Sequence, residues 1–200
     1  MNNFVTIGNG NAKLGMAIPN INLPAGMTCR ADAPCKKGCY ACRGNFTFTN
    51  VATAIKNNYE AFCSNSALYF DEIRVRTALN KYVRWHSSGD IISPKYLDGM
   101  CAVARANKST HYLCFTKKYE IVNDYVYSGH KIPKNLSIVF SNWGDWKCYN
   151  PYNFPTAWVE FKNRDNREIP DTAQKCNGKC AECQYCWHMK KGQSVYFPKH

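Results

Sequence analysis

The chain has 200 residues, of which 12 are cysteines, and its 26 basic and 14 acidic residues give a formal net charge of +12. A chain of this length buries a core without cross-links, so the cysteines are not needed as staples. The first residues show neither a signal-peptide pattern nor a long apolar run. We therefore expect a cytoplasmic protein with no membrane partner, whose thiols bind metal rather than form disulfides.

In chain order, residues 13–19 are expected to hold one short strand, followed by a loop that carries the first group of cysteines. A helix is predicted over about 46–63, because apolar residues recur there at spacings of three and four: Val51, Ala54, Ile55, Tyr59 and Phe62. A second helix is predicted over 67–80.

From residue 81 onward, strand-like and helix-like stretches alternate. Strands are predicted over 82–86, 110–115, 136–140 and 157–161, and helices over 94–106 and 118–127. Such alternation is typical of right-handed crossovers and a mainly parallel sheet. The predicted fold is α/β, either a partial (β/α) barrel or an open mainly parallel sheet, with a cysteine-rich N-terminal loop and a C-terminal appendage.

We expect one domain over residues 1–200. Residues 1–45 hold the first strand and cysteine loop, 46–165 the α/β body, and 166–200 a C-terminal cysteine segment.

Eight cysteines fall into two groups, and thiolates at such short spacings usually hold a metal or an iron–sulfur cluster. The first group is Cys29, Cys35, Cys39 and Cys42, and the second is Cys176, Cys180, Cys183 and Cys186. We interpret the other four, Cys63, Cys101, Cys114 and Cys148, as core or surface residues.

The spacing within each group bears on the metal. Three cysteines in C-x3-C-x2-C spacing on one loop favour a [4Fe-4S] cluster at the N-terminal group. The C-terminal group, with four cysteines in eleven residues, suits either [4Fe-4S] or structural zinc. His188 is a candidate substitute ligand there.

Cys35, Cys39 and Cys42, together with Ser87-Ser-Gly-Asp90 after the strand over 82–86, resemble the radical S-adenosylmethionine superfamily. The resemblance implies that three thiolates hold a [4Fe-4S] cluster with one iron open to S-adenosylmethionine. It also implies that Ser88, Gly89 and Asp90 bind this cofactor. The sequence departs from the superfamily at Ala41, at Asp90 where Glu is usual, and at Cys29. If Cys29 closed the open iron, the protein would be a redox or structural module and not an enzyme.

A narrower likeness covers most of the chain. The chain looks like a member of the phage gene product 88 family in its run Leu23-Pro-Ala-Gly-Met-Thr-Cys29, the first cysteines, Ser87–Asp90, Phe115-Thr-Lys117 and the ending Cys180-x2-Cys183-x2-Cys186-Trp187.

The prediction is a phage-type iron–sulfur protein with two [4Fe-4S] clusters, redox-active or radical-generating, in the host cytoplasm and with an electron donor as partner. Its catalytic residues and its reaction are not assigned. The alternative is a zinc-stabilised basic protein that binds nucleic acid or another anionic partner through its positive charge. A basic surface that meets only solvent explains the charge equally well.

Overall fold

One open, eight-stranded sheet organises the computed structural model, which describes residues 4–198. The strand order is β1-β2-β3-β4-β5-β6-β8-β7, and every neighbouring pair is parallel except β1 with β2. The strands are β1 (Ile7–Gly8), β2 (Asn20–Ile21), β3 (Tyr82–Trp85), β4 (His111–Thr116), β5 (Leu136–Ser141), β6 (Thr156–Glu160), β7 (Gln174–Lys175) and β8 (Ser194–Pro198). The predicted α/β fold is confirmed as an open sheet and not a barrel.

The helices agree closely with the periodicity of the sequence. The α-helices are α1 (Thr49–Ser64), α2 (Ser66–Thr77), α3 (Pro94–Ala106), α4 (Tyr119–Tyr127) and α5 (Cys180–Cys183). Short 3-10 turns are η1 (Pro34–Gly38), η2 (Tyr40–Cys42), η3 (Gly44–Thr47) and η4 (Tyr185–Trp187). The side chain of Ser93 accepts a hydrogen bond from the Tyr96 amide and caps α3, as side-chain oxygens do at helix starts.

The predicted strand over 13–19 is wrong. Gly10 and Gly15 have φ angles of 82° and 79°, and the Asn11 side chain accepts hydrogen bonds from the Lys13 and Leu14 amides. Glycine favours these left-handed turns, which break an extended run. The first strands instead lie on either side of this segment, as β1 and β2.

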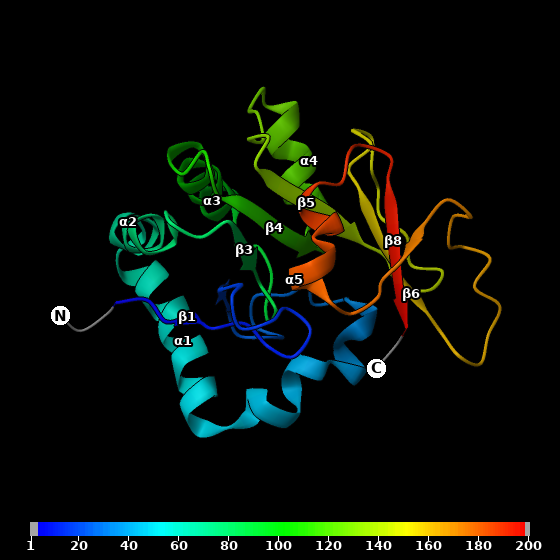
Figure 1. Cartoon of the computed structure of the whole chain (residues 1–200), viewed down its shortest axis with the longest axis horizontal. Coiled ribbons are helices and arrows are strands. Elements are labelled where there is room, and N and C mark those ends of the chain that lie inside the picture. Colours follow the sequence, from blue (N-terminus) through cyan, green and yellow to red (C-terminus); the bar gives the residue numbers. More distant parts are fainter. Residues whose placement is uncertain (1–3, 199–200) are drawn as a thin grey trace.

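The two faces of the sheet are covered differently, as Figure 1 shows. Side chains alternate along a strand, so Val83 and Trp85 join one core and Tyr82 joins the other. The first core packs against α2, α3 and α4. The second is covered by the segment around α5 and by the loop containing Leu14 and Ile18.

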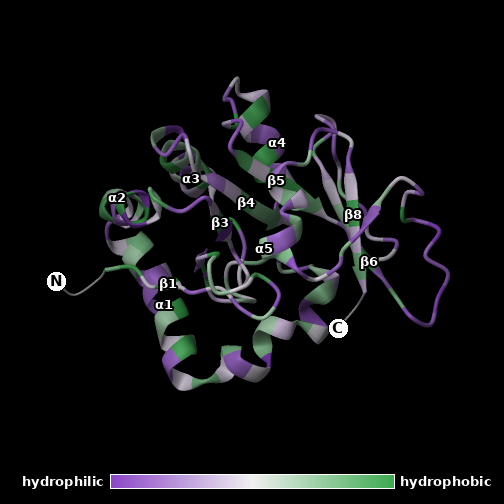
Figure 2. Ribbon diagram, viewed as in Figure 1, coloured by the Kyte–Doolittle hydropathy of each residue, from purple (hydrophilic) through white to green (hydrophobic). Residues whose placement is uncertain are grey.

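The C-terminal segment is integrated into the fold. The indole of Trp187 is 3% exposed and donates a 2.9 Å hydrogen bond to the Val83 carbonyl. The hydroxyl of Ser137 donates to the Cys186 carbonyl at 2.8 Å. By contrast, the loop between β6 and β7 is mostly hydrophilic (Figure 2). None of the helices in residues 4–198 is long and apolar enough to cross a membrane.

Candidate metal centres

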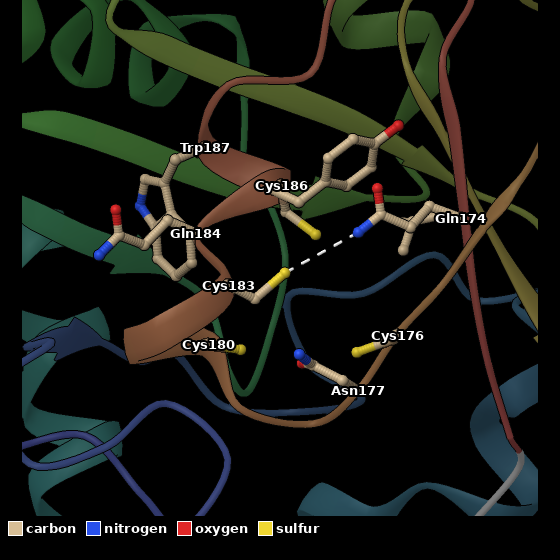
Figure 3. Close-up of a pocket in the computed structure, with 10 residues that line it drawn as sticks. Gln174, Cys176, Asn177, Cys180, Cys183, Gln184, Cys186 and Trp187 are labelled. Carbon is tan, nitrogen blue, oxygen red and sulfur yellow. Dashed lines mark hydrogen bonds between the residues drawn. The ribbon is translucent and has the colours of Figure 1, made fainter.

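The four C-terminal cysteines line one small pocket on the sheet face opposite α2, α3 and α4. Cys176 follows β7, Cys180 and Cys183 begin and end α5, and Cys186 lies in η4. Figure 3 shows their four sulfur atoms arranged around the same space. The side-chain amide of Gln174 reaches Cys183 Sγ at 3.9 Å. The structure therefore brings together all four predicted ligands of this site.

Local backbone geometry explains the convergence. Gln184 adopts a left-handed conformation (φ 54°) that ends α5 and turns the chain toward Cys186. The Cys180 amide donates to the Lys13 carbonyl at 2.9 Å, which ties α5 to the N-terminal loop. A Cβ on Gly15 would lie 3.1 Å from Ala181 Cβ, so the two segments are in close contact. The site thus depends on residues far apart in the sequence.

Burial governs the ionisation of these thiols. It raises the pKa of Cys186 to about 12 and also raises the pKa of Cys180. The nearby guanidinium of Arg84 opposes both shifts, whereas the neighbouring thiols reinforce them. Cysteine binds a metal as the thiolate. A cationic metal centre would therefore supply the positive charge that favours ionisation of these thiols.

His188, the candidate substitute ligand, contacts other residues. Its Nε2 lies 3.1 Å from the Tyr82 hydroxyl, and its ring centroid is 4.7 Å from that of His111. The residues that line the pocket supply thiols and amides but no imidazole.

The N-terminal cysteines lie on the irregular segment between β2 and α1. Cys35 is in η1, Cys39 separates η1 from η2, and Cys42 ends η2. Cys42 is exposed, and the other three are partly buried. The Cys42 amide donates to the Cys39 carbonyl at 3.1 Å, so a tight turn holds these two residues together.

This loop meets the carboxyl ends of the central strands. The Tyr40 hydroxyl donates a hydrogen bond to the Ser87 carbonyl, just beyond β3. Burial raises the pKa of Cys29, and the charges of Asp90, Cys39 and Cys35 add to this shift. Cys29 therefore lies within electrostatic range of two of the other three thiols. Ligands of parallel α/β sheets usually bind at this edge.

Ser88, Gly89 and Asp90 attach the N-terminal loop to the sheet. The Ser88 hydroxyl donates to the Leu23 carbonyl at 2.9 Å. Gly89 has a φ of 81°, and a Cβ there would lie 2.7 Å from Leu23 and Thr28 atoms. The tight contact explains why glycine is needed.

The carboxylate of Asp90 is almost fully buried. It accepts hydrogen bonds from the Thr116 hydroxyl at 2.6 Å, the Lys117 amide at 2.9 Å and the Ile91 amide at 2.7 Å. Burial nevertheless raises its pKa. In this structure, the side chains predicted to meet a cofactor hold protein segments together.

The surroundings of two residues at the end of β3, Arg84 and His86, were not predicted from the sequence. His86 is buried with a φ of 58°, and its ring contacts the Tyr96 hydroxyl at 3.1 Å and Cys114 Sγ at 3.6 Å. Burial lowers its pKa to about 3, so the imidazole is neutral. Arg84 lies within β3, on the sheet face that carries the C-terminal cysteines. The sequence offered one signal for Arg84, which is a charged residue within an otherwise apolar strand.

An open parallel sheet with four thiols on one face and four at its carboxyl edge defines a cysteine-rich α/β protein with two candidate metal centres. Within residues 4–198, no group of three or more His, Cys, Asp or Glu side chains is already placed to hold a metal ion. The family described as Gene product 88 matches residues 5–189, and the chain belongs to this family. The phage family expected from the sequence is thereby confirmed. No curated protein and no solved structure matches the chain.

Proposed function

We propose that this protein is an iron–sulfur protein whose C-terminal cysteines bind a [4Fe-4S] cluster. The observation that carries the proposal is the convergence of Cys176, Cys180, Cys183 and Cys186 on one partly enclosed pocket. Four thiolates are the usual ligand set of such clusters. The ligands come from a strand end, a helix and a turn that pack on the sheet, so a bound cluster would stabilise this face.

The donor set also bears on the choice between a cluster and zinc. Zinc with Zn–S bonds of about 2.3 Å requires four sulfur atoms roughly 3.8 Å apart around one ion. In a cubane each thiolate binds its own iron, so the sulfur atoms lie farther apart. Figure 3 shows the four thiols around one common space, and we propose that a cubane fills it and not a single zinc ion.

We propose a second [4Fe-4S] cluster at Cys35, Cys39 and Cys42. These thiols lie on an accessible loop at the carboxyl edge of the sheet, and Tyr40 links that loop to Ser87. Cys29 decides the role of this site. As a fourth ligand it would make the site redox-active or structural, whereas a free Cys29 would leave one iron open.

A second candidate function, reductive cleavage of S-adenosylmethionine, rests on the position of this loop beside residues 88–90. Ser88 and Asp90 are engaged with Leu23, Thr116 and Lys117. A cofactor at this edge would therefore meet the backbone of the segment or displace these hydrogen bonds.

The primary test is an iron, sulfide and zinc count on protein purified without oxygen, together with electron paramagnetic resonance. About eight irons and eight sulfides per chain are expected from two [4Fe-4S] clusters. Stoichiometric zinc without iron would reject the proposal. That result would support the alternative, a zinc-stabilised protein that binds nucleic acid. Its affinity for DNA or RNA should then fall steeply as the salt concentration rises.

The enzyme version has its own test. Wild type and a Cys29→Ala variant are incubated with S-adenosylmethionine and dithionite, and 5′-deoxyadenosine is measured. Cleavage by either protein supports the enzyme, and greater cleavage by Cys29→Ala identifies Cys29 as the blocking ligand. If neither forms the product although both contain iron, the enzyme version is rejected and the redox or structural version stands.

A further inference from the structure

Four of the loops that lead into parallel strands carry lysines but no acidic residue. The loops are residues 78–81 before β3, 107–110 before β4, 128–135 before β5 and 188–193 before β8. Their lysines, which we call the amino-edge lysines, are all exposed: Lys81, Lys108, Lys131, Lys134, Lys190 and Lys191. Within residues 4–198, no ion pair includes any of them. These charges are therefore open to an external anion.

Hydrogen bonds join the loops before β4 and β5 to each other. The Asn135 side chain donates to the Asn107 and Thr110 carbonyls at 3.1 and 2.8 Å. The Arg105 guanidinium, at the end of α3, donates to the Lys131 carbonyl at 3.0 Å. The lysines of these two loops therefore lie at one edge of the sheet, where β4 and β5 begin.

The other two loops reach the same edge. The His111 amide, at the start of β4, donates to the Lys81 carbonyl at 2.9 Å. The His188 ring lies beside the His111 ring, with centroids 4.7 Å apart, and its Nε2 is 3.1 Å from the Tyr82 hydroxyl at the start of β3. Four loops that are far apart in the sequence thus form one basic surface, the amino edge of the sheet.

Helix stabilisation does not account for these lysines. A cation stabilises a helix when it lies in the last turn. The last turn of α2 holds Arg74 and Arg76, which pair with acidic residues of the same helix. The last turn of α3 holds Arg105, and that of α4 holds no basic residue. The amino-edge lysines lie beyond the helix ends, where like charges repel one another, so a bound polyanion explains them better.

We propose that the amino edge binds the phosphate backbone of double-stranded nucleic acid. Lysine is a flexible point charge, which suits contact with backbone phosphates and not the reading of bases. A duplex carries one negative charge per about 1.7 Å, twice the density of a single strand. The four loops contain no Phe, Tyr or Trp, the rings on which unpaired bases stack. The inference does not depend on which metal the cysteines bind.

An anionic membrane is the other extended anion that a basic surface can meet. Segments that lie on membranes are typically amphipathic helices with an apolar face, whereas all six amino-edge lysines are on loops between elements. The observations therefore favour nucleic acid, and lipid vesicles serve as a competing partner in the test.

The test measures binding of the whole chain to a labelled DNA duplex by fluorescence anisotropy over a range of salt concentrations. Single-stranded DNA of the same length and phosphatidylglycerol vesicles are measured beside it. The edge variant combines Lys108→Gln, Lys131→Gln and Lys134→Gln, which removes three charges from two adjoining loops. Replacement of the same three lysines by arginine retains the charge.

The matched control combines Lys95→Gln, Lys147→Gln and Lys162→Gln. These lysines are also exposed, but they follow the carboxyl ends of β3, β5 and β6. Each variant removes three positive charges, so a difference between the two reports where the charge is lost and not how much.

The edge variant should bind the duplex about tenfold or more weakly at about 0.1 M salt. The slope of log affinity against log salt concentration should fall by about 2 to 3, because each lost phosphate contact removes about 0.9. The control variant should change the affinity by less than about threefold, since at this salt charges more than about 10 Å from the duplex are screened. The arginine variant should bind like wild type.

Equal losses in the edge and control variants would overturn the amino edge as the binding site. Wild type that binds no duplex at low salt, or that binds single strands more tightly, would overturn the proposal as well. Binding to the vesicles but not to DNA would assign the surface to a membrane instead.

If the edge variant fails to fold by circular dichroism, the double variant Lys190→Gln with Lys191→Gln, on a separate loop, decides by the same criteria. A protein without iron that binds the duplex through this edge would overturn the proposed function and leave this inference standing. An iron-loaded protein that binds no duplex would do the reverse.

Discussion

The two cysteine groups have the same number of thiols but very different surroundings. The C-terminal group is part of the cover of the sheet, with Trp187 buried beside it and β8 pairing with both β6 and β7. In the N-terminal group, Cys35 and Cys42 lie on the turns η1 and η2, in which no residue is buried. The difference indicates that the C-terminal arrangement suits stabilisation of the fold, whereas the N-terminal arrangement suits access by a partner or substrate.

The attachment of each group follows the same division. The C-terminal group rests on hydrogen bonds to the Val83 carbonyl, Ser137 and the Lys13 carbonyl. The N-terminal loop is joined to the sheet by the hydroxyl of Tyr40, a residue that is 56% exposed, and by the contact of Thr28 with Asp90. A cluster on the N-terminal loop would be accessible to partners, and its loss would lower the stability of the fold only slightly.

The largest effect is expected for Cys186→Ser. The variant should lose about four irons per chain and several kcal/mol of unfolding free energy, because a bound structural metal contributes on the order of 10 kcal/mol. Iron counting and urea unfolding measure the two effects. Cys63→Ser, at an exposed position of α1, is the control. Unchanged stability in Cys186→Ser would contradict the assigned stabilising role of this site.

A smaller effect is expected for Trp187→Ala, about 3–5 kcal/mol of unfolding free energy from lost burial. Trp187→Phe keeps most of the packing and loses the hydrogen bond to the Val83 carbonyl, so about 1 kcal/mol is expected. At the N-terminal site, Tyr40→Phe also removes one hydrogen bond to a carbonyl, and its loss of unfolding free energy should not exceed that of Trp187→Phe. Urea midpoints provide the measurement, and equal losses in Trp187→Ala and Tyr40→Phe would remove the contrast between the sites.

The buried imidazole of His86, just after β3, should make the stability of the fold depend on pH. Because burial lowers the pKa of His86 to about 3 from an ordinary 6.5, the unfolded chain binds one more proton between these values. His86 stabilises the fold fully above pH 6.5 and loses this contribution as the pH falls, by about 1.4 kcal/mol per pH unit.

The measurement is the unfolding free energy between pH 7 and pH 5 for wild type and His86→Asn, since Asn tolerates the left-handed backbone. The variant should lose stability less steeply than wild type. His130→Asn, at an exposed position, should follow the wild type. Parallel curves for wild type and His86→Asn would show that the buried imidazole is not the acid-sensitive group.

The smallest effect on stability is expected for Cys39→Ser. The variant should lose about four irons, like Cys186→Ser, but its unfolding free energy should stay within about 1 kcal/mol of wild type, because the turns η1 and η2 on either side of Cys39 bury no residue. Iron content and urea midpoints are measured together. A loss of several kcal/mol here would make both sites structural.

Much of the fold could be predicted from the sequence because the signals were local. The helical period predicted α1, and the alternation of strand-like and helix-like stretches after residue 81 predicted α3. The two-residue strands β1, β2 and β7 could not be predicted, because pairing with distant partners and not local propensity defines them.

The cysteines of each site could be grouped by spacing alone, but their surroundings could not. Residues 88–90 read as a loop open to a ligand, whereas the structure engages Asp90 with Thr116 and Lys117. The position of Arg84 over the Phe115 ring depends on the pairing of β3 with β4 and on the direction of its side chain. Such contacts between segments far apart in sequence leave no local pattern.

The placement of β8 between β6 and β7 has a consequence for the order in which the protein is made. Within the described residues, β7 pairs with β8 alone, so the strand that precedes Cys176 has no sheet partner until residues 194–198 have left the ribosome. The N-terminal cysteines and β3 to β5 are synthesised well before this point. The N-terminal loop can therefore take its place during translation, whereas the pocket of the C-terminal cysteines is completed only after β8 has been added.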